Sequence, residues 1–111
     1  MDDVGAIVVD EAIAIHRLLR PGLLEIVYET VLAGRLEARG LKVARQLAVP
    51  LMVGGHHFET AFRVDILVDD RVVLEIKAVE QLGKAHARQL LTYLRILQQP
   101  VGLLHNFRAR R

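Results

Sequence analysis

The chain has 111 residues, of which 52% are hydrophobic and 25% are charged, with no cysteine and a formal net charge of +2. This composition is typical of one globular domain over residues 1–111, and it excludes disulfides, thiolate metal sites and a disordered chain. The longest uncharged run, 46–58, is too short to span a bilayer, and two aspartates follow the first Met where a secretory signal would be basic. We therefore expect a cytoplasmic protein that has no membrane partner.

The first two predicted elements are helices. Over 4–19 the apolar residues recur three or four positions apart, which is the spacing of one helix face. A second helix is expected over about 22–39, because Pro21 suits a first helical turn and Gly40 suits the position just past a helix end. The side chains that this helix is expected to turn inward are Leu24, Val27, Tyr28, Val31, Leu32 and Leu36.

The rest of the chain is predicted to contain strands and one further helix. Strands are expected over 41–53, 56–68 and 71–79, followed by a helix over about 84–98 and a last strand over 101–107. Pro50 interrupts the first strand, so that strand is expected to reach a sheet edge or bend there, and Gly54 and Gly55 mark the next turn. The order is α-α-β-β-β-α-β, which indicates an α/β fold with a mixed sheet flanked by helices.

Three charged residues stand in the two most apolar strands. Asp65 lies in the first of these, and Glu75 and Lys77 lie in the second, although a buried charge without a partner is costly. A three-residue loop or a bulge between the strands would leave one face of the hairpin wholly apolar. The pairs in that register are Ile66–Leu74, Val64–Ile76, Asp65–Glu75 and Arg63–Lys77. The two carboxylates then lie side by side and need a proton or nearby cations.

Two interpretations of this charged face follow from the residues alone. Clustered carboxylates beside a lysine are typical of an oxygen-ligand site for Mg²⁺ or Mn²⁺, which keeps several of its waters. Alternatively, Arg63, Asp65, Glu75 and Lys77 form a solvated ion-pair face on an exposed sheet. The scattered histidines do not favour a zinc site, since no two of them have the helical i, i+4 spacing.

The same residues carry a resemblance to a known family. Asp65 followed by EIK at 75–77 resembles the D…(D/E)XK core of the PD-(D/E)XK nuclease superfamily, with valine where that pattern has proline. The segment GLLEIVY at 22–28 is similar to the signature of the GxxExxY family within that superfamily. The similarity continues in order through GLKVARQ, FRVDILV, VVLEIKAVE, HARQLLTYL and VGLLHNF, so it extends from about residue 7 to 107.

The resemblance implies a restriction-endonuclease-like αβββαβ core, preceded by an extra N-terminal helix and holding one divalent-metal site. Carried over to this sequence, the metal ligands are Asp65, Glu75 and the backbone carbonyl of Ile76. Lys77 is implied to orient or deprotonate the attacking water, or to stabilise charge on the phosphate. Glu25 resembles the acidic helix residue that lends a further carboxylate to the metal or to its water shell.

A last implied site residue lies in the third predicted helix. Gln89 resembles the residue that follows the catalytic strand in many of these nucleases, and it shares a helix face with Tyr93. These residues also have plainer interpretations. Gln89 and Tyr93 could form hydrogen bonds at the sheet edge, and Glu25 near a helix start is favoured by the helix dipole alone. Tyr28 is expected in the core with a partner for its hydroxyl, and His86 on the helix surface.

The function expected from the resemblance is metal-dependent hydrolysis of phosphodiester bonds in nucleic acid, with DNA favoured over RNA and Mg²⁺ or Mn²⁺ as cofactor. The alternative is a catalytically silent domain that keeps the nuclease fold and binds nucleic acid or a partner protein. Affinity for nucleic acid would come from individual Arg and Lys contacts to phosphates, since the net charge is only +2. The mean hydropathy of +0.28 fits a homodimer interface.

Overall fold

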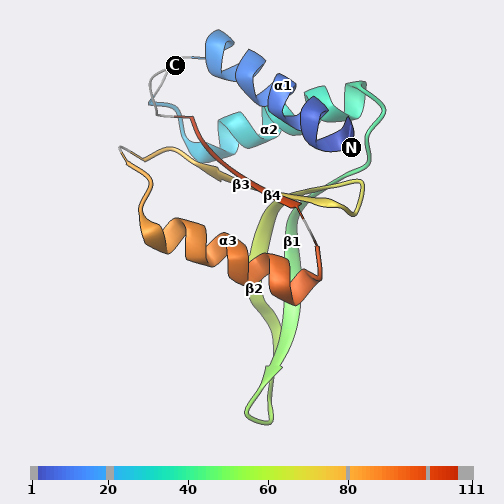
Figure 1. Cartoon of the computed structure of the whole chain (residues 1–111), viewed down its shortest axis with the longest axis vertical. Coiled ribbons are helices and arrows are strands. Elements are labelled where there is room, and N and C mark those ends of the chain that lie inside the picture. The colour runs from blue at the N-terminus through green and yellow to red at the C-terminus, as the bar shows by residue number, and fades with distance from the viewer. Residues whose placement is uncertain (1–2, 20–21, 80, 100, 108–111) are drawn as a thin grey trace.

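The computed structural model describes residues 3–19, 22–79, 81–99 and 101–107. The predicted order of elements is confirmed, as is the α/β class. The elements in Figure 1 are helices α1 (Asp3–Leu18) and α2 (Glu25–Ala38), strands β1 (Val43–Val53), β2 (His56–Val68) and β3 (Val72–Lys77), helix α3 (Lys84–Leu97) and strand β4 (Val101–Asn106). None of the described helices is long and apolar enough to cross a membrane.

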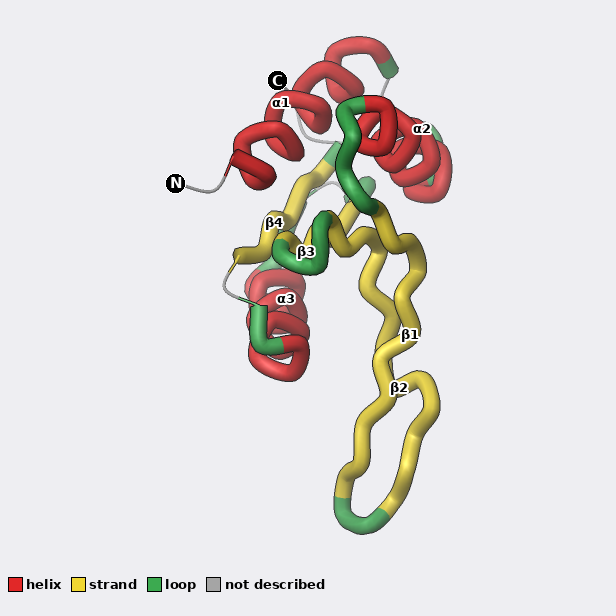
Figure 2. The backbone as a smooth tube through the Cα atoms, turned by 90° about the vertical axis from the view of Figure 1, so that its right-hand side faces the viewer, coloured by secondary structure: helices red, strands yellow, loops and turns green. Residues whose placement is uncertain are grey.

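The strands form one mixed sheet in the order β1-β2-β3-β4. β2 is antiparallel to both β1 and β3, whereas β3 and β4 are parallel, and α3 is the crossover that a parallel pair requires. Helices α1 and α2 cover one face of the sheet and α3 covers the other, while the β1–β2 hairpin extends well beyond the helices (Figures 1 and 2). Strand β3 is therefore buried on both faces, which accounts for its nearly continuous apolar sequence.

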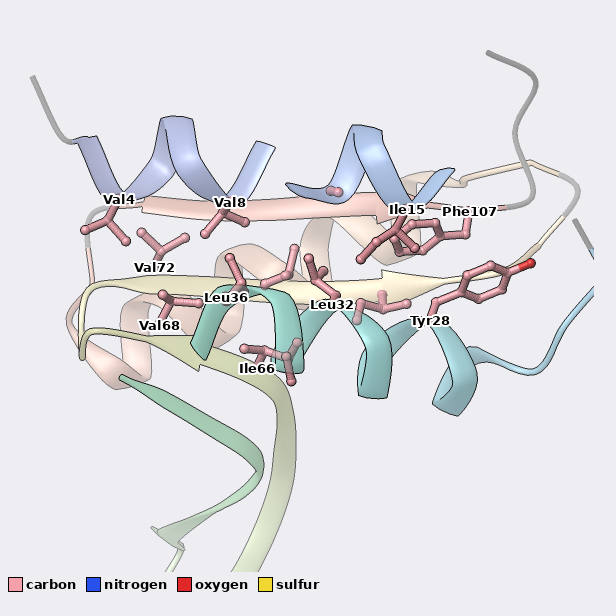
Figure 3. Packing of buried hydrophobic residues seen from close by; sticks show 14 residues of the cluster. Val4, Val8, Ile15, Tyr28, Leu32, Leu36, Ile66, Val68, Val72 and Phe107 are labelled. Atoms are coloured by element: carbon pink, nitrogen blue, oxygen red, sulfur yellow. The ribbon is translucent and has the colours of Figure 1, made fainter. Parts of the chain in front are cut away.

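Two hydrophobic cores lie on the two faces of the sheet. The larger one joins α1 and α2 to β2, β3 and β4, and Figure 3 shows its side chains meeting between the helices and the strands. The second core packs α3 onto the hairpin, where the Tyr93 ring stacks on Phe62 with the ring centroids 4.1 Å apart. Both cores contact β3, so this strand is held from both sides.

Helix α2 turns inward a narrower face than expected. Three of the six predicted side chains, Leu24, Val27 and Val31, are exposed, and Leu24 is 74% exposed. The buried residues of the helix are Tyr28, Glu29, Leu32, Ala33 and Leu36. Only one side of α2 meets α1 and the sheet, so its buried stripe is narrow and includes an acidic residue that hydrophobicity does not identify.

The turn between β2 and β3 has the predicted three-residue loop, over 69–71. The predicted register is confirmed at Ile66, which pairs with Leu74. The ladder ends at that pair, because the carboxylate of Asp65 replaces the next backbone acceptor. As ladder pairs, three of the expected ones are therefore wrong, namely Val64–Ile76, Asp65–Glu75 and Arg63–Lys77.

The hairpin does not have one apolar face and one charged face. Leu67 and Val73, which share the face of the charged residues, are buried in the second core. Val64 lies in that core too, although Ile66 lies in the larger core, so the strict alternation breaks between them. Because helices cover both faces of the sheet, the solvated ion-pair interpretation is wrong for Glu75, which is only 3% exposed.

Candidate functional site

The candidate site lies where β2 and β3 separate. The N–H of Ile76 donates to Oδ2 of Asp65 at 2.7 Å rather than to a backbone carbonyl of β2. The N–H of Asp65 in turn donates to Oε1 of Glu75 across a longer distance of 3.4 Å. The predicted proximity of Asp65 and Glu75 is therefore confirmed, but it comes from contacts between side chain and backbone rather than from a ladder pair.

Burial and a neighbouring charge make Glu75 a weak acid. The pKa of Glu75 is raised to about 8, first by burial and then by the negative charge of Asp65. The positive charge of Lys77 lowers that pKa only in part. At neutral pH Glu75 is therefore mostly protonated, and a bound cation would favour its ionised form.

Strand β4 fixes the end of the strand that carries Glu75 and Lys77. The parallel ladder continues to the pair Lys77–Asn106, and the carbonyl of Lys77 accepts a hydrogen bond from the N–H of Phe107 at 2.9 Å. The buried Asn106 side chain donates to the carbonyl of Val79 at 2.8 Å and accepts from its N–H at 3.1 Å. The half-buried Lys77 side chain thus extends from a backbone that β4 and Phe107 hold in place.

Helix α2 brings its first residue, Glu25, to the same region. Oε2 of Glu25 accepts a hydrogen bond from the N–H of Ala78 at 2.9 Å, just beyond the end of β3. Glu25 also borders a cavity of about 360 Å³ beside the separated strands. The residues that line this cavity are Glu25, Ile26, Glu29, Gln46, Asp65 and Ile76. Three predicted site residues, Glu25, Asp65 and Ile76, therefore surround one space, while their chemical roles stay predictions.

Helix α3 approaches the carboxylates from the other face of the sheet, through Tyr93. The pKa of the Tyr93 hydroxyl is raised by burial and by the negative charges of Glu75 and Asp65. Gln89 lies one helical turn earlier in α3, so the two share a helix face as predicted, and the Gln89 side chain lowers the pKa of Tyr93 in part. Gln89 itself is exposed, so Tyr93 is the residue that links α3 electrostatically to the carboxylates.

The sequence did not single out two residues of this region, Glu29 and Gln46. Nε2 of Gln46 donates to Oε1 of Glu29 at 2.6 Å and lies 3.4 Å from Oδ1 of Asp65. Glu29 is 3% exposed, and its other oxygen accepts from Nη2 of Arg45 at 2.9 Å. Two signals could have identified these residues. Glu29 follows Glu25 at i+4 and so lies on the same helix face. A predicted register for the β1–β2 hairpin would have placed Gln46 opposite Asp65.

Two other residues have the plainer roles expected of them. Tyr28 is buried, its ring stacks on Phe107 with the centroids 4.6 Å apart, and its hydroxyl accepts from the N–H of Leu23 at 3.3 Å. His86 accepts a hydrogen bond at Nδ1 from the N–H of Gly83 at 2.9 Å, which helps to cap α3. Neither residue is among those that line the cavity.

The carboxylates of Asp65 and Glu75 are the type of ligand that a divalent metal prefers, although they do not form a complete set of ligands by themselves. Within the described ranges, no group of three or more His, Cys, Asp or Glu side chains is placed to hold a metal ion. Asp65 and Glu75 are in contact, however, and Mg²⁺ takes one or two protein carboxylates and completes its shell with waters. Their charge is only partly offset by Lys77, so the residues present fit Mg²⁺ or Mn²⁺.

The comparisons with known proteins bear on the whole chain. No curated protein and no solved structure matches it. A family model described as the PD-(D/E)XK nuclease superfamily matches residues 2–111. That match includes the hairpin with Asp65, the strand with Glu75 and Lys77, and the helix that begins at Glu25. With nearly every residue covered, the chain belongs to the PD-(D/E)XK nuclease superfamily.

Proposed function

We propose that this chain is a nuclease of the GxxExxY family that hydrolyses phosphodiester bonds, in DNA rather than RNA, with Mg²⁺ or Mn²⁺ as its cofactor. Superfamily membership supports the reaction, and the GLLEIVY segment at 22–28 supports the subfamily. The observation that carries the proposal is the contact between Asp65 and Glu75 where the two strands separate. Paired carboxylates with a lysine two residues away are suited to metal-assisted hydrolysis.

The metal would be held by Asp65, Glu75 and the backbone carbonyl of Ile76, with Glu25 binding its water shell. When bound, a divalent cation polarises the phosphate and lowers the pKa of a coordinated water, which makes that water a nucleophile at neutral pH. With a pKa of about 8, Glu75 is mostly protonated in the metal-free protein at neutral pH. Glu75 therefore releases a proton when it becomes a ligand, and metal affinity should rise with pH.

Lys77 would act on the phosphate. As the water oxygen bonds to phosphorus and the bond to the leaving oxygen breaks, negative charge builds up, and a positioned ammonium group stabilises it. The hydrogen bonds that hold the backbone around Lys77 support this role, because the charge is then in place before the reaction begins. The products are a phosphate monoester and a free hydroxyl group.

Cleavage assays test the proposal directly. Supercoiled plasmid, single-stranded DNA and RNA are incubated with the protein and either Mn²⁺ or EDTA. Lys77→Ala is purified in parallel with a matched control, Lys84→Ala, which removes an exposed lysine at the start of α3. We expect metal-dependent cutting of DNA that persists in Lys84→Ala and is lost in Lys77→Ala.

Two other outcomes would contradict this expectation. Cutting that survives in Lys77→Ala would point to a contaminating nuclease. A wild-type protein that binds DNA but never cuts it would favour the silent binding domain. In either case, binding that weakens steeply with added salt would still report contacts from Arg and Lys to phosphates.

A further inference from the structure

Gln46 occupies an unusual backbone position directly across from Asp65. The β1–β2 ladder pairs Arg45 with Ile66 and Leu47 with Val64, so Gln46 falls opposite Asp65. Its φ of 48° lies in the left-handed region, which side chains other than glycine rarely adopt in a strand. Residues held in such conformations persist only where their surroundings fix them, and they gather at functional sites.

The side-chain amide of Gln46 is fixed by two carboxylates. Nε2 donates to Oε1 of Glu29 at 2.6 Å and lies 3.4 Å from Oδ1 of Asp65. The nitrogen of a glutamine side-chain amide donates two hydrogen bonds and accepts none. The carboxylate oxygens of Glu29 and Asp65 are both acceptors, so the nitrogen and not the oxygen of the amide must face them. A flipped amide would set its oxygen against two carboxylates. In this orientation the carbonyl oxygen is the atom of the amide that neither carboxylate contacts, and Gln46 is one of the residues that line the cavity.

Glu29 is itself held in place. It is 3% exposed, and Oε2 accepts from both Nε and Nη2 of Arg45, at 3.1 and 2.9 Å. Nη2 of Arg45 also donates to Oγ1 of Thr30 at 2.8 Å. The guanidinium of Arg45 thus sets a positive charge against the buried carboxylate and holds it in place as an acceptor for the amide. A chain of contacts thus runs from Arg45 through Glu29 and Gln46 to Asp65.

We propose that Gln46 is a positioning residue of the candidate nuclease site, which Glu29 locks in one orientation. In that orientation Gln46 steadies the carboxylate of Asp65 and presents its carbonyl oxygen to the cavity, where it accepts a hydrogen bond from the water that attacks the phosphate. Glu29 then acts only through Gln46. This inference rests on the proposed function, because it assigns a role in the same reaction.

If the contacts from Arg45 to Asp65 only stabilise the fold, substitutions in them should affect stability but not cleavage. Glu11 offers the comparison, because it is a buried carboxylate of α1 that is 6% exposed and bound by Arg35 and Arg39 at 3.1 and 3.7 Å. It does not line the cavity. If Glu29 only joins two elements, Glu29→Gln and Glu11→Gln should have the same effects, on stability alone.

The experiment combines single-turnover cleavage of plasmid DNA in Mn²⁺ with amide exchange in the metal-free protein. The variants are Gln46→Ala, Gln46→Gly, Glu29→Gln, the double variant Glu29→Gln/Gln46→Ala, and the control Glu11→Gln. Gln46→Gly is included because glycine adopts positive φ without strain, which keeps the hairpin folded. Exchange of the Gln46 side-chain amide protons is compared by NMR with that of the exposed Gln98.

We expect both single Gln46 variants and Glu29→Gln to cut about 10- to 100-fold more slowly at saturating DNA, with the half-saturating DNA concentration little changed. The double variant should be no slower than Gln46→Ala, because residues that act in one chain are not additive. Glu11→Gln should cut at the wild-type rate. In the metal-free protein, the Gln46 amide protons should exchange more slowly than those of Gln98, and Glu29→Gln should abolish that protection.

Each contrary result has a separate meaning. Wild-type rates in Gln46→Gly, or additive losses in the double variant, would overturn the positioning role while the nuclease assignment stands. Gln46 protons that exchange as fast as those of Gln98 would overturn the lock by Glu29. A wild-type protein that neither cuts DNA nor binds Mn²⁺ would overturn the proposed function, and the role of Gln46 in the reaction with it.

Discussion

The N–H of Ile76 donates to Oδ2 of Asp65 at 2.7 Å, where the β2–β3 ladder would otherwise continue. Asp65 therefore satisfies a backbone donor of β3 that the separation of the strands would leave without an acceptor. The same contact fixes the direction of the carboxylate beside Glu75. One side chain thus links the opening of the sheet to the placement of a metal ligand in the proposed site.

The variant Asp65→Asn should separate these two roles. An asparagine oxygen still accepts from the N–H of Ile76, so the free energy of unfolding should fall by no more than about 1 kcal/mol. Asp65→Ala leaves the donor unpaired and should cost about 1–3 kcal/mol. Neither variant should bind Mn²⁺ as the wild type does. Urea unfolding and Mn²⁺ titration followed by EPR check both expectations, and wild-type Mn²⁺ affinity in Asp65→Asn would contradict the ligand role.

In the absence of metal, Glu75 should make the protein less stable as the pH rises. Its pKa is about 8 in the folded chain against an ordinary value of 4.5, so the folded state binds the extra proton between these values. The stabilisation that Glu75 contributes is therefore greatest at the acidic end and is lost toward pH 8, by on the order of 1 kcal/mol per pH unit. Unfolding in EDTA across this range should show the slope, and Glu75→Gln should remove it. Added Mn²⁺ should reduce it in the wild type.

His105 should make the protein less stable as the pH falls, whereas Glu75 does so as the pH rises. Nδ1 of His16 and Nε2 of His105 lie 3.1 Å apart between α1 and β4, and burial together with His16 lowers the pKa of His105 below 6.5. The folded state therefore favours the neutral ring, and its stabilisation is complete above pH 6.5 and lost as the pH falls. We expect His105→Gln to flatten the acidic limb of the stability profile. The comparison uses the Glu75→Gln background, with the exposed His57→Gln as control.

The inner face of α2 can be checked by a pair of leucine substitutions. Leu32 is fully buried in the larger core, whereas Leu24 is 74% exposed just before the helix. Leu32→Ala should lower the free energy of unfolding by about 2–5 kcal/mol, because it removes core contacts and leaves a cavity. Leu24→Ala should change it by no more than about 0.5 kcal/mol. Equal losses in the two variants would contradict the observed orientation of α2.

The sequence predicted the order of elements and the closeness of Asp65 to Glu75, because both depend on local patterns. Gly54 and Gly55 mark a turn, and a short loop fixes which residues of β2 and β3 meet at Ile66 and Leu74. These features need only the period of the apolar residues and the chemistry of turns.

Whether a face of a strand or helix is buried depends on which other elements pack against it. The spacing of apolar residues within one element does not reveal this. Leu67 and Val73 share the face of the charged residues, yet α3 buries them, so the charged face is not solvated. The left-handed backbone conformation of Gln46 likewise could not be predicted, because the sequence around it is that of a regular strand. Its partner Glu29 resembles a surface residue of a helix until β1 places Arg45 and Gln46 against it.

The pairing of β3 with β4 also sets the order in which the site is completed during folding. Lys77 pairs with Asn106 only after the whole of α3 has been made and folded back, so this contact is distant in sequence. The β2–β3 turn can close much earlier, because its partners are neighbours in the chain. On a ribosome, Asp65 and Glu75 would thus meet first, and Lys77 would be held firmly only when β4 emerges. Under the proposed function, the nascent chain acquires its cutting activity only after β4 has emerged.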